Sequence, residues 1–130
     1  MVGDDPLVDR FFRVFYDRFI GNSDIAQMFE GTDMQHQAAM LKASLFELTS
    51  CALFGKPSPE LTRLALLHKR RGIDAKMLDE WLAALLDTVE TFDQGWRQTT
   101  ERAWRLALDP GIAYVKGFEI PNSTQAVSGP

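Results

Sequence analysis

The sequence predicts an all-α fold, built as a packed box of helices. Apolar residues recur at helical spacing along nearly the whole chain, and no segment shows the clear alternation that predicts a strand. Glycine and proline interrupt this pattern at intervals that suit helices of ordinary length. The 130 residues are 45% hydrophobic and 25% charged, which is the balance of one globular domain.

The first half of the chain predicts a short helix between two long ones. Asp5 followed by Pro6 is a typical helix start, and Gly21 is a typical stop. Thr32 and Gln35 have the spacing of a capping box, so the second long helix is expected to begin there. The expected ranges are residues 6–20, 23–29 and 32–54. The inward stripe expected on the longest helix is Met34, Gln37, Ala38, Leu41, Leu45, Leu48 and Ala52.

The second half predicts three further helices. Ser58 and Pro59 repeat the start signal, and Gly72 ends that helix. Pro110 falls inside the last helix and is expected to bend it, because proline removes one backbone donor. The expected ranges are residues 58–72, 75–92 and 97–116. The residues expected on the buried side of the last helix are Ala103, Trp104 and Ala107. Residues 1–118 are expected to form the domain and residues 119–130 a flexible tail.

Charge and composition exclude several classes of protein. The net charge of −4 argues against nucleic acid as a partner, because that binding needs a basic surface. The single cysteine, Cys51, excludes an internal disulfide and suits a reducing compartment. The longest apolar stretch, residues 43–54, contains Glu47 and is too short to cross a membrane. No signal peptide is visible, so the cytoplasm is the expected location and no membrane partner is expected.

His68 is the candidate functional residue with the clearest chemical requirement. It shares a helix face with Leu61, Leu64 and Ala65, so its imidazole is expected to lose contact with water. Such an imidazole needs a protein hydrogen-bond partner or serves as a metal ligand, for example an axial ligand of haem. A core histidine with a satisfied hydrogen bond is the commoner case. Zinc held by His36 and His68 is a weak alternative, because their spacing forms no ligand motif.

Two further polar residues are predicted to point toward the same interior. Gln37 lies between Met34 and Leu41 on an apolar stripe, and Tyr16 shares a face with neighbouring phenylalanines. A phenol, an amide and an imidazole inside an apolar box form the usual kind of cofactor site. His36 stays open as an alternative to Gln37, should the register of that helix differ by one residue.

Five sequence blocks together resemble a known family. They are FYDRFIGNSDIAQMF (15–29), GTDMQHQAAMLKASL (31–45), HKRRGI (68–73), LDEWLAALLDTVETFD (78–93) and AWRLALDPGIAYVK (103–116). In this order and spacing the chain resembles a bacterial single-domain globin, related to the globin modules of flavohaemoglobins and globin-coupled sensors. The resemblance covers residues 7–116 and implies a globin fold that binds haem b (iron protoporphyrin IX). Almost nothing precedes the helix that bears Tyr16, so the family's first helix is expected to be absent or strongly shortened.

The resemblance also implies roles for individual residues. His68 matches the proximal iron ligand, Tyr16 and Gln37 match the distal polar pair, and Phe29 matches the phenylalanine that wedges against haem. The other residues expected to line the haem are Leu41, Leu64, Ile73, Leu78 and Trp81. Leu78 stands where flavohaemoglobins carry a tyrosine behind the proximal histidine, so the peroxidase-like network of that family is not expected. A backbone carbonyl near Leu64 is expected to accept the ring N–H of His68 instead.

The function implied is reversible binding of dioxygen, with nitric oxide and carbon monoxide as further ligands. Gas sensing, storage and nitric oxide detoxification all stay open, and no catalytic side chain is assigned. The detoxification reaction needs an external reductant, because the chain has no glycine-rich nucleotide loop. A reductase or signalling partner and a homodimer stay open. The alternative is a haem-free globin-fold regulatory module, in which Tyr16 and Gln37 bond each other.

Overall fold

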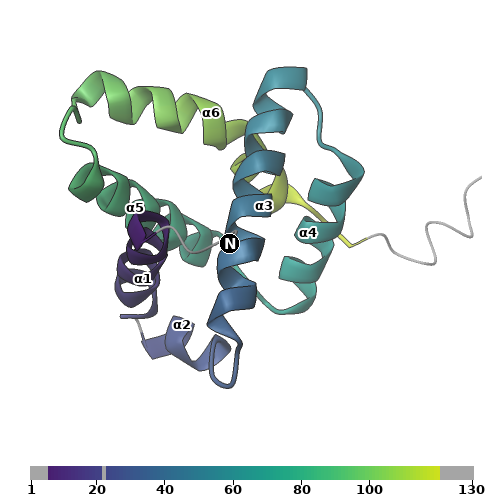
Figure 1. Ribbon diagram of the computed structural model, residues 1–130. Helices are drawn as coiled ribbons and strands as arrows, with labels where there is room; N and C mark the ends of the chain where they lie inside the picture. Colours follow the sequence, from purple (N-terminus) through teal and green to yellow (C-terminus); the bar gives the residue numbers. More distant parts are fainter. Residues whose placement is uncertain (1–5, 22, 121–130) are drawn as a thin grey trace, which may run out of the picture.

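The computed structural model describes residues 6–21 and 23–120. In this part of the chain every regular secondary-structure element is a helix (Figure 1). Six helices account for it, one of them short, as the sequence predicts. They are α1 (Pro6–Ile20), α2 (Ser23–Met28), α3 (Met34–Phe54), α4 (Pro59–Arg70), α5 (Ala75–Phe92) and α6 (Gln98–Gly117). The all-α prediction is confirmed. The cap expected at Asp5 and residues 121–130 of the tail expected at 119–130 lie outside the described residues.

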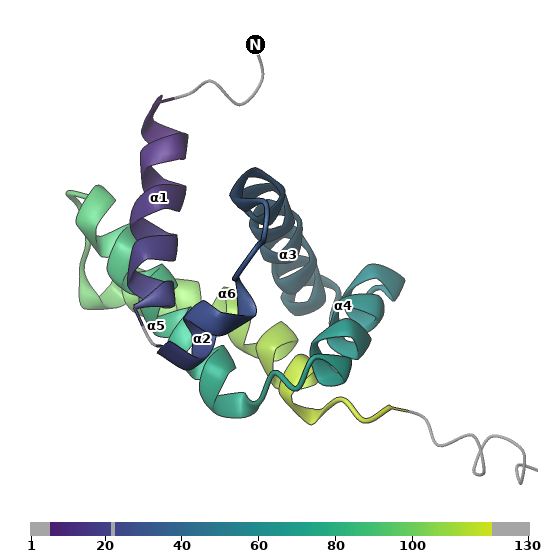
Figure 2. The ribbon, with the colours of Figure 1, turned by 90° about the horizontal axis from the view of Figure 1, so that it is seen from below.

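The helices pack in two groups that share a central core. The long helix α3 packs most extensively against α6, and α1 packs against α5. The shorter α4 rests on α6 and α3, next to the lower half of α3 in Figure 1. Seen from below in Figure 2, α3 lies on one side of the molecule, between α1 and α4, with α6 beneath it. The side chains buried completely at the centre are Phe15, Leu61, Ala65, Leu85, Thr88 and Leu108.

Capping residues fix where several helices begin and end. Gly55 ends α3 in the left-handed region with φ 73°, where a side chain would be strained. Ser58 caps α4 by accepting a hydrogen bond from the backbone N–H of Leu61 at 3.0 Å. Asp74 caps α5 in the same way through the N–H of Met77 at 2.9 Å.

Three details of the sequence prediction are wrong. The N-cap of α3 is Asp33, whose carboxylate accepts from the N–H of Gln35, and Thr32 does not cap it. Met34 is 37% exposed and does not belong to the inward stripe. Ala103 is exposed as well, because α6 turns its later residues toward the core. The buried residues of α6 are Leu108, Gly111, Ile112 and Val115.

Gly111 allows α6 to lie directly against α3. A Cβ atom added at Gly111 would sit 2.6 Å from Leu48 Cδ2, 3.0 Å from Leu48 Cα and 3.2 Å from the Leu48 carbonyl oxygen. The Cδ2 atom could rotate away, but the two backbone atoms could move only if the helices separated. Glycine at this position therefore fixes the distance between α3 and α6.

Gly111→Ala is expected to lower the free energy of unfolding by about 1–3 kcal/mol, because the added methyl group overpacks the α3–α6 contact. This loss outweighs the gain in helix propensity, which is about 1 kcal/mol. The control is Gly117→Ala, where a Cβ meets no atom within 4 Å. Urea unfolding measures both variants. Equal stability of the two variants would contradict the close approach.

Candidate functional site

The imidazole of His68 is held in one orientation by its own helix. Its Nδ1 lies 2.8 Å from the backbone carbonyl oxygen of Leu64, one turn earlier in α4. A carbonyl can only accept, so Nδ1 carries the proton and Nε2 keeps its lone pair. The predicted carbonyl partner near Leu64 is confirmed. This tautomer is the one in which an imidazole can bind a metal through Nε2.

The Nε2 atom of His68 is open to a ligand. It has no hydrogen-bond partner among the described residues. No fully buried side-chain nitrogen or oxygen in the same part of the chain lacks a partner. Nε2 is therefore unpaired yet reachable from outside, although the ring as a whole is only partly exposed.

The surroundings of His68 keep it neutral. Burial lowers the pKa of the imidazole below its ordinary value of 6.5, and the positive charge of Arg71 lowers it further. The hydrogen bond to Leu64 opposes this shift without cancelling it. A neutral imidazole at pH 7 offers its lone pair to a metal without first losing a proton. Arg71 was not among the residues predicted for the site, although it follows His68 by only three positions.

We expect the haem-free protein to lose stability as the pH falls below about 6.5, partly through His68. The unfolded chain takes up a proton near the ordinary pKa of 6.5, whereas the folded state takes it up only at lower pH. Protonation therefore favours unfolding in this window. Urea unfolding at pH 7.5 and 5 measures the effect, with His68→Gln as the comparison. An equal pH dependence in the two proteins would contradict the shift.

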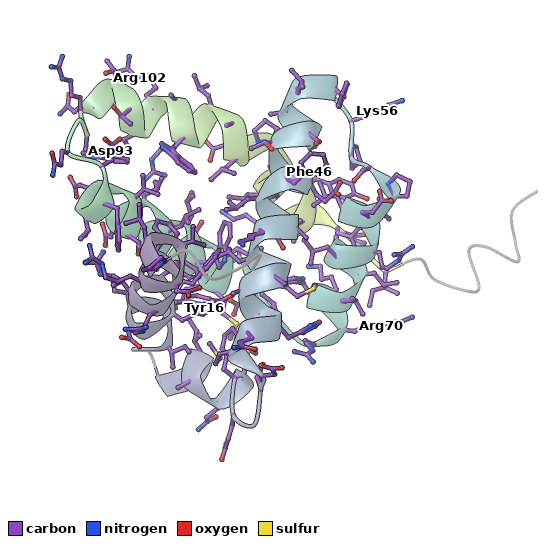
Figure 3. All side chains as sticks on the ribbon, in the orientation of Figure 1. Tyr16, Phe46, Lys56, Arg70, Asp93 and Arg102 are labelled. Atoms are coloured by element: carbon purple, nitrogen blue, oxygen red, sulfur yellow. The ribbon has the colours of Figure 1, made fainter. Side chains whose placement is uncertain are left out.

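Tyr16 connects α1 to the start of α3. Its hydroxyl donates a hydrogen bond to the backbone carbonyl oxygen of Gln37 at 2.9 Å. The side chain is buried, and burial raises the pKa of Tyr16 to about 12, so the phenol stays protonated at neutral pH. Figure 3 shows Tyr16 between these two helices. The sequence predicted an inward phenol, but it could not predict that a backbone carbonyl 21 residues away would accept its proton.

The side-chain amide of Gln37 is available for a ligand. Gln37 is partly buried, and its amide has no hydrogen-bond partner among the described residues. The neighbouring His36 is exposed, so the ordering of these two residues agrees with the predicted stripe. Of the two, Gln37 is the one on the same side of α3 as the buried Leu41.

Apolar side chains from several helices pack against Tyr16 or against the core cluster to which it belongs. Phe29 packs edge-to-face against Tyr16, with ring centroids 5.8 Å apart, and Trp81 packs against Phe15 at 6.3 Å. Leu41 is buried in the core. The predicted lining residues that keep part of their apolar surface exposed are Phe29, Leu64, Ile73, Leu78 and Trp81. All of these except Ile73 pack against the same core cluster as Tyr16 and Leu41.

Two surface grooves lie elsewhere on the molecule. One is lined by the apolar residues Leu7, Val8, Phe11, Phe12 and Phe92, between the ends of α1 and α5. The other is lined by Arg18, Phe19, Glu80, Ala83, Ala84 and Asp87. Neither groove includes His68 or Gln37. Sequence reasoning did not identify them, because each combines residues from helices far apart in the chain.

The described residues do not form a metal site built from protein side chains alone. They contain no group of three or more His, Cys, Asp or Glu side chains that could hold a metal ion together. A metal bound by His68 would therefore need its other ligands from a cofactor. Within the same residues, no helix has the length and apolar character needed to cross a membrane.

A solved structure resembles the chain in fold and in sequence. It is the crystal structure of PA3967 from Pseudomonas aeruginosa, described as structurally highly homologous to a human hemoglobin. The two chains share 34% identity over 82% of each, with a TM-score of 0.75. No family model and no curated protein matches the chain. Identity and coverage at this level show that the chain belongs to the same globin-like family as PA3967.

Proposed function

We propose that this protein is a globin that binds haem through His68 and uses it to bind diatomic gases. The observation that carries the proposal is the state of the imidazole. Its Nδ1 proton is held by the Leu64 carbonyl at 2.8 Å, while its Nε2 lone pair is unpaired and reachable. Membership of a globin-like family supports the proposal, and so does the neutral charge of the ring.

The residues present fit haem in their chemistry. His68 supplies one nitrogen donor, and the partly exposed faces of Phe29, Leu64, Leu78 and Trp81 supply apolar surface for a porphyrin. His68 would hold the iron through Nε2, and haem would supply a metal that binds dioxygen, nitric oxide or carbon monoxide. Purified protein is expected to show an intense haem absorption band, and a colourless protein that takes up no added haem would refute the proposal.

Gln37 and Tyr16 have different roles on the distal side. The Gln37 amide is the free donor, and its N–H can donate to a gas ligand that carries partial negative charge. Tyr16 holds the backbone of Gln37 in place through its hydroxyl, since that proton already points at the carbonyl oxygen. Both groups stay neutral at pH 7, so neither repels a polarised ligand.

Tyr16→Phe is expected to lower the free energy of unfolding by about 1 kcal/mol and to speed the release of dioxygen, because Gln37 loses its anchor. Tyr114→Phe is the matched control. Its hydroxyl shares a hydrogen bond of 2.9 Å with Thr62, between α4 and α6. It should lose similar stability without any change in release. Stopped-flow kinetics measures release, and an equal effect of both variants on it would contradict the anchoring role.

We propose three possible uses of the bound gas, which are storage, sensing and detoxification of nitric oxide. Storage requires only binding of the gas, whereas sensing also requires a signalling partner. Detoxification of nitric oxide by bound dioxygen requires a reductase, because the reaction leaves the iron oxidised. Turnover of nitric oxide in the presence of a reductant separates detoxification from the other two.

One observation favours a second candidate, a haem-free regulatory module. The Tyr16 hydroxyl is already satisfied by Gln37 without any ligand, in partial agreement with what that alternative predicts. Titration of the purified protein with haem distinguishes the candidates. Binding at one haem per chain that is lost in His68→Ala supports the globin, and absence of binding supports the module.

A further inference from the structure

The longest helix, α3, is apolar on two opposite sides. Its inner side carries the buried Leu41, Leu48 and Cys51. Its outer side carries a second stripe at alternating spacings of four and three residues, which we call the outer stripe. The outer stripe consists of four exposed apolar residues and one half-buried serine, which are Ala39, Ala43, Phe46, Leu53 and Ser50. Phe46 is 67% exposed and Leu53 is 78% exposed.

No helix of the described chain covers the outer stripe. Figure 2 shows α6 on one side of α3 and open space on the opposite side, and Figure 3 labels Phe46 on the exposed part of the helix. A helix that is apolar on all sides is normally buried on all sides. Lys42 and Glu47 are the only Lys, Arg, Asp or Glu residues among its 21.

The spacing of the outer stripe is that of a two-stranded coiled coil. Apolar residues separated by four and three positions form the seam at which two helices meet. The small side chains of Ala39, Ala43 and Ser50 allow a close approach, while Phe46 and Leu53 supply the apolar surface. We propose that the outer stripe is the contact surface between two copies of this chain, with the two α3 helices parallel.

The two charged residues of α3 favour a second copy and set its direction. Lys42 flanks one side of the outer stripe, and Glu47, five residues later, flanks the other. In a parallel pair, residues so placed meet across the seam, so Lys42 of each copy faces Glu47 of the other. An antiparallel pair would instead bring the Lys42 side of one helix against the Lys42 side of the other.

The contacts that Lys42 and Glu47 already make within the chain leave both side chains able to form an ion pair with a second copy. The Lys42 ammonium lies 5.5 Å from the centre of the Phe12 ring, and the side chain is exposed. Glu47 accepts from Ser58 through Oε1, while Oε2 has no partner among the described residues. The outer side of α3 offers on the order of 400 Å² of apolar surface, which is about half of a standard interface. The dimer is therefore expected to dissociate in the micromolar range.

Sedimentation velocity between 1 and 200 µM tests the proposal on the full chain. The wild-type protein should change from monomer to dimer in this range, and Phe46→Glu should weaken the dimer by about 30-fold or more. The control is Leu106→Glu on α6, since Leu106 is 69% exposed but lies outside the outer stripe. It should leave the dimer unchanged. A monomer at all concentrations, or a dimer that survives Phe46→Glu, would overturn the proposal.

Disulfide cross-linking tests the parallel direction. In a background with Cys51→Ala, Ala43→Cys and Ser50→Cys should each give a cross-linked dimer on oxidation, because both positions face themselves across a parallel seam. An antiparallel pair allows at most one of the two. Neither experiment depends on haem, so failure of the dimer and failure of the proposed function are distinguishable.

Discussion

His68→Gly is expected to yield a protein that folds but does not retain haem. The variant removes the Nε2 atom that we propose binds the iron, and only apolar contacts with the porphyrin would then remain. We expect haem affinity to fall by at least about 100-fold, the upper end of the effect of changes around metal ligands. Added imidazole should restore binding, because a free ring can occupy the space left by the side chain. Haem content per chain, measured after gel filtration, gives the result.

The other histidine provides a matched control. His36→Gly carries a similar penalty for glycine in a helix, about 1 kcal/mol, but His36 is exposed on the outer side of α3. This variant should keep its haem. Loss of haem in His36→Gly with retention in His68→Gly would reverse the assignment of the ligand.

Gln37→Leu is expected to speed the release of dioxygen by about 5- to 150-fold, the equivalent of one hydrogen bond of 1–3 kcal/mol in a dry pocket. Release of carbon monoxide should change much less, because that ligand carries little negative charge. The expected effect on dioxygen release follows from the unpaired amide of Gln37, which is the hydrogen-bond donor that the substitution removes. Stopped-flow and flash-photolysis kinetics measure the two rates.

Gln35→Leu serves as its control, because Gln35 lies on the same helix but is exposed. Its backbone N–H, which Asp33 caps at 3.0 Å, is unaffected by the change. An unchanged dioxygen rate in Gln37→Leu would show that the amide does not reach the ligand. The distal donor would then have to be sought elsewhere, with Tyr16 as the first candidate.

The helix boundaries could be predicted because their causes are local. Gly55 and Ser58 act on backbone groups a few residues away, and the ranges expected from the sequence end and begin beside them. The capping role of Asp74 was not predicted, although the range expected for α5 begins at the next residue. The N-cap of α3 was misplaced by one residue, because Thr32 and Asp33 are both good caps. Only the extended backbone at Asp33, with φ −73° and ψ 110°, decides between them.

In the site too, contacts within one helix could be predicted from the sequence, whereas contacts between helices could not. The Leu64 carbonyl is one turn from His68 on the same helix, so the sequence predicts their contact. The bond from Tyr16 to Gln37 joins two helices, and its acceptor is a backbone atom that no side-chain pattern indicates. The exposure of Phe46 and Leu53 depends on which side of α3 receives α6, and that is a property of the whole fold.

A crystal structure of the protein reconstituted with haem would show directly which side chain binds the iron. We expect one haem per chain, with His68 Nε2 bonded to the iron and Nδ1 still hydrogen-bonded to the Leu64 carbonyl. Iron held by any other side chain would contradict this assignment. So would a protein that crystallises without haem, with the space beside His68 filled by Leu64 and Leu78.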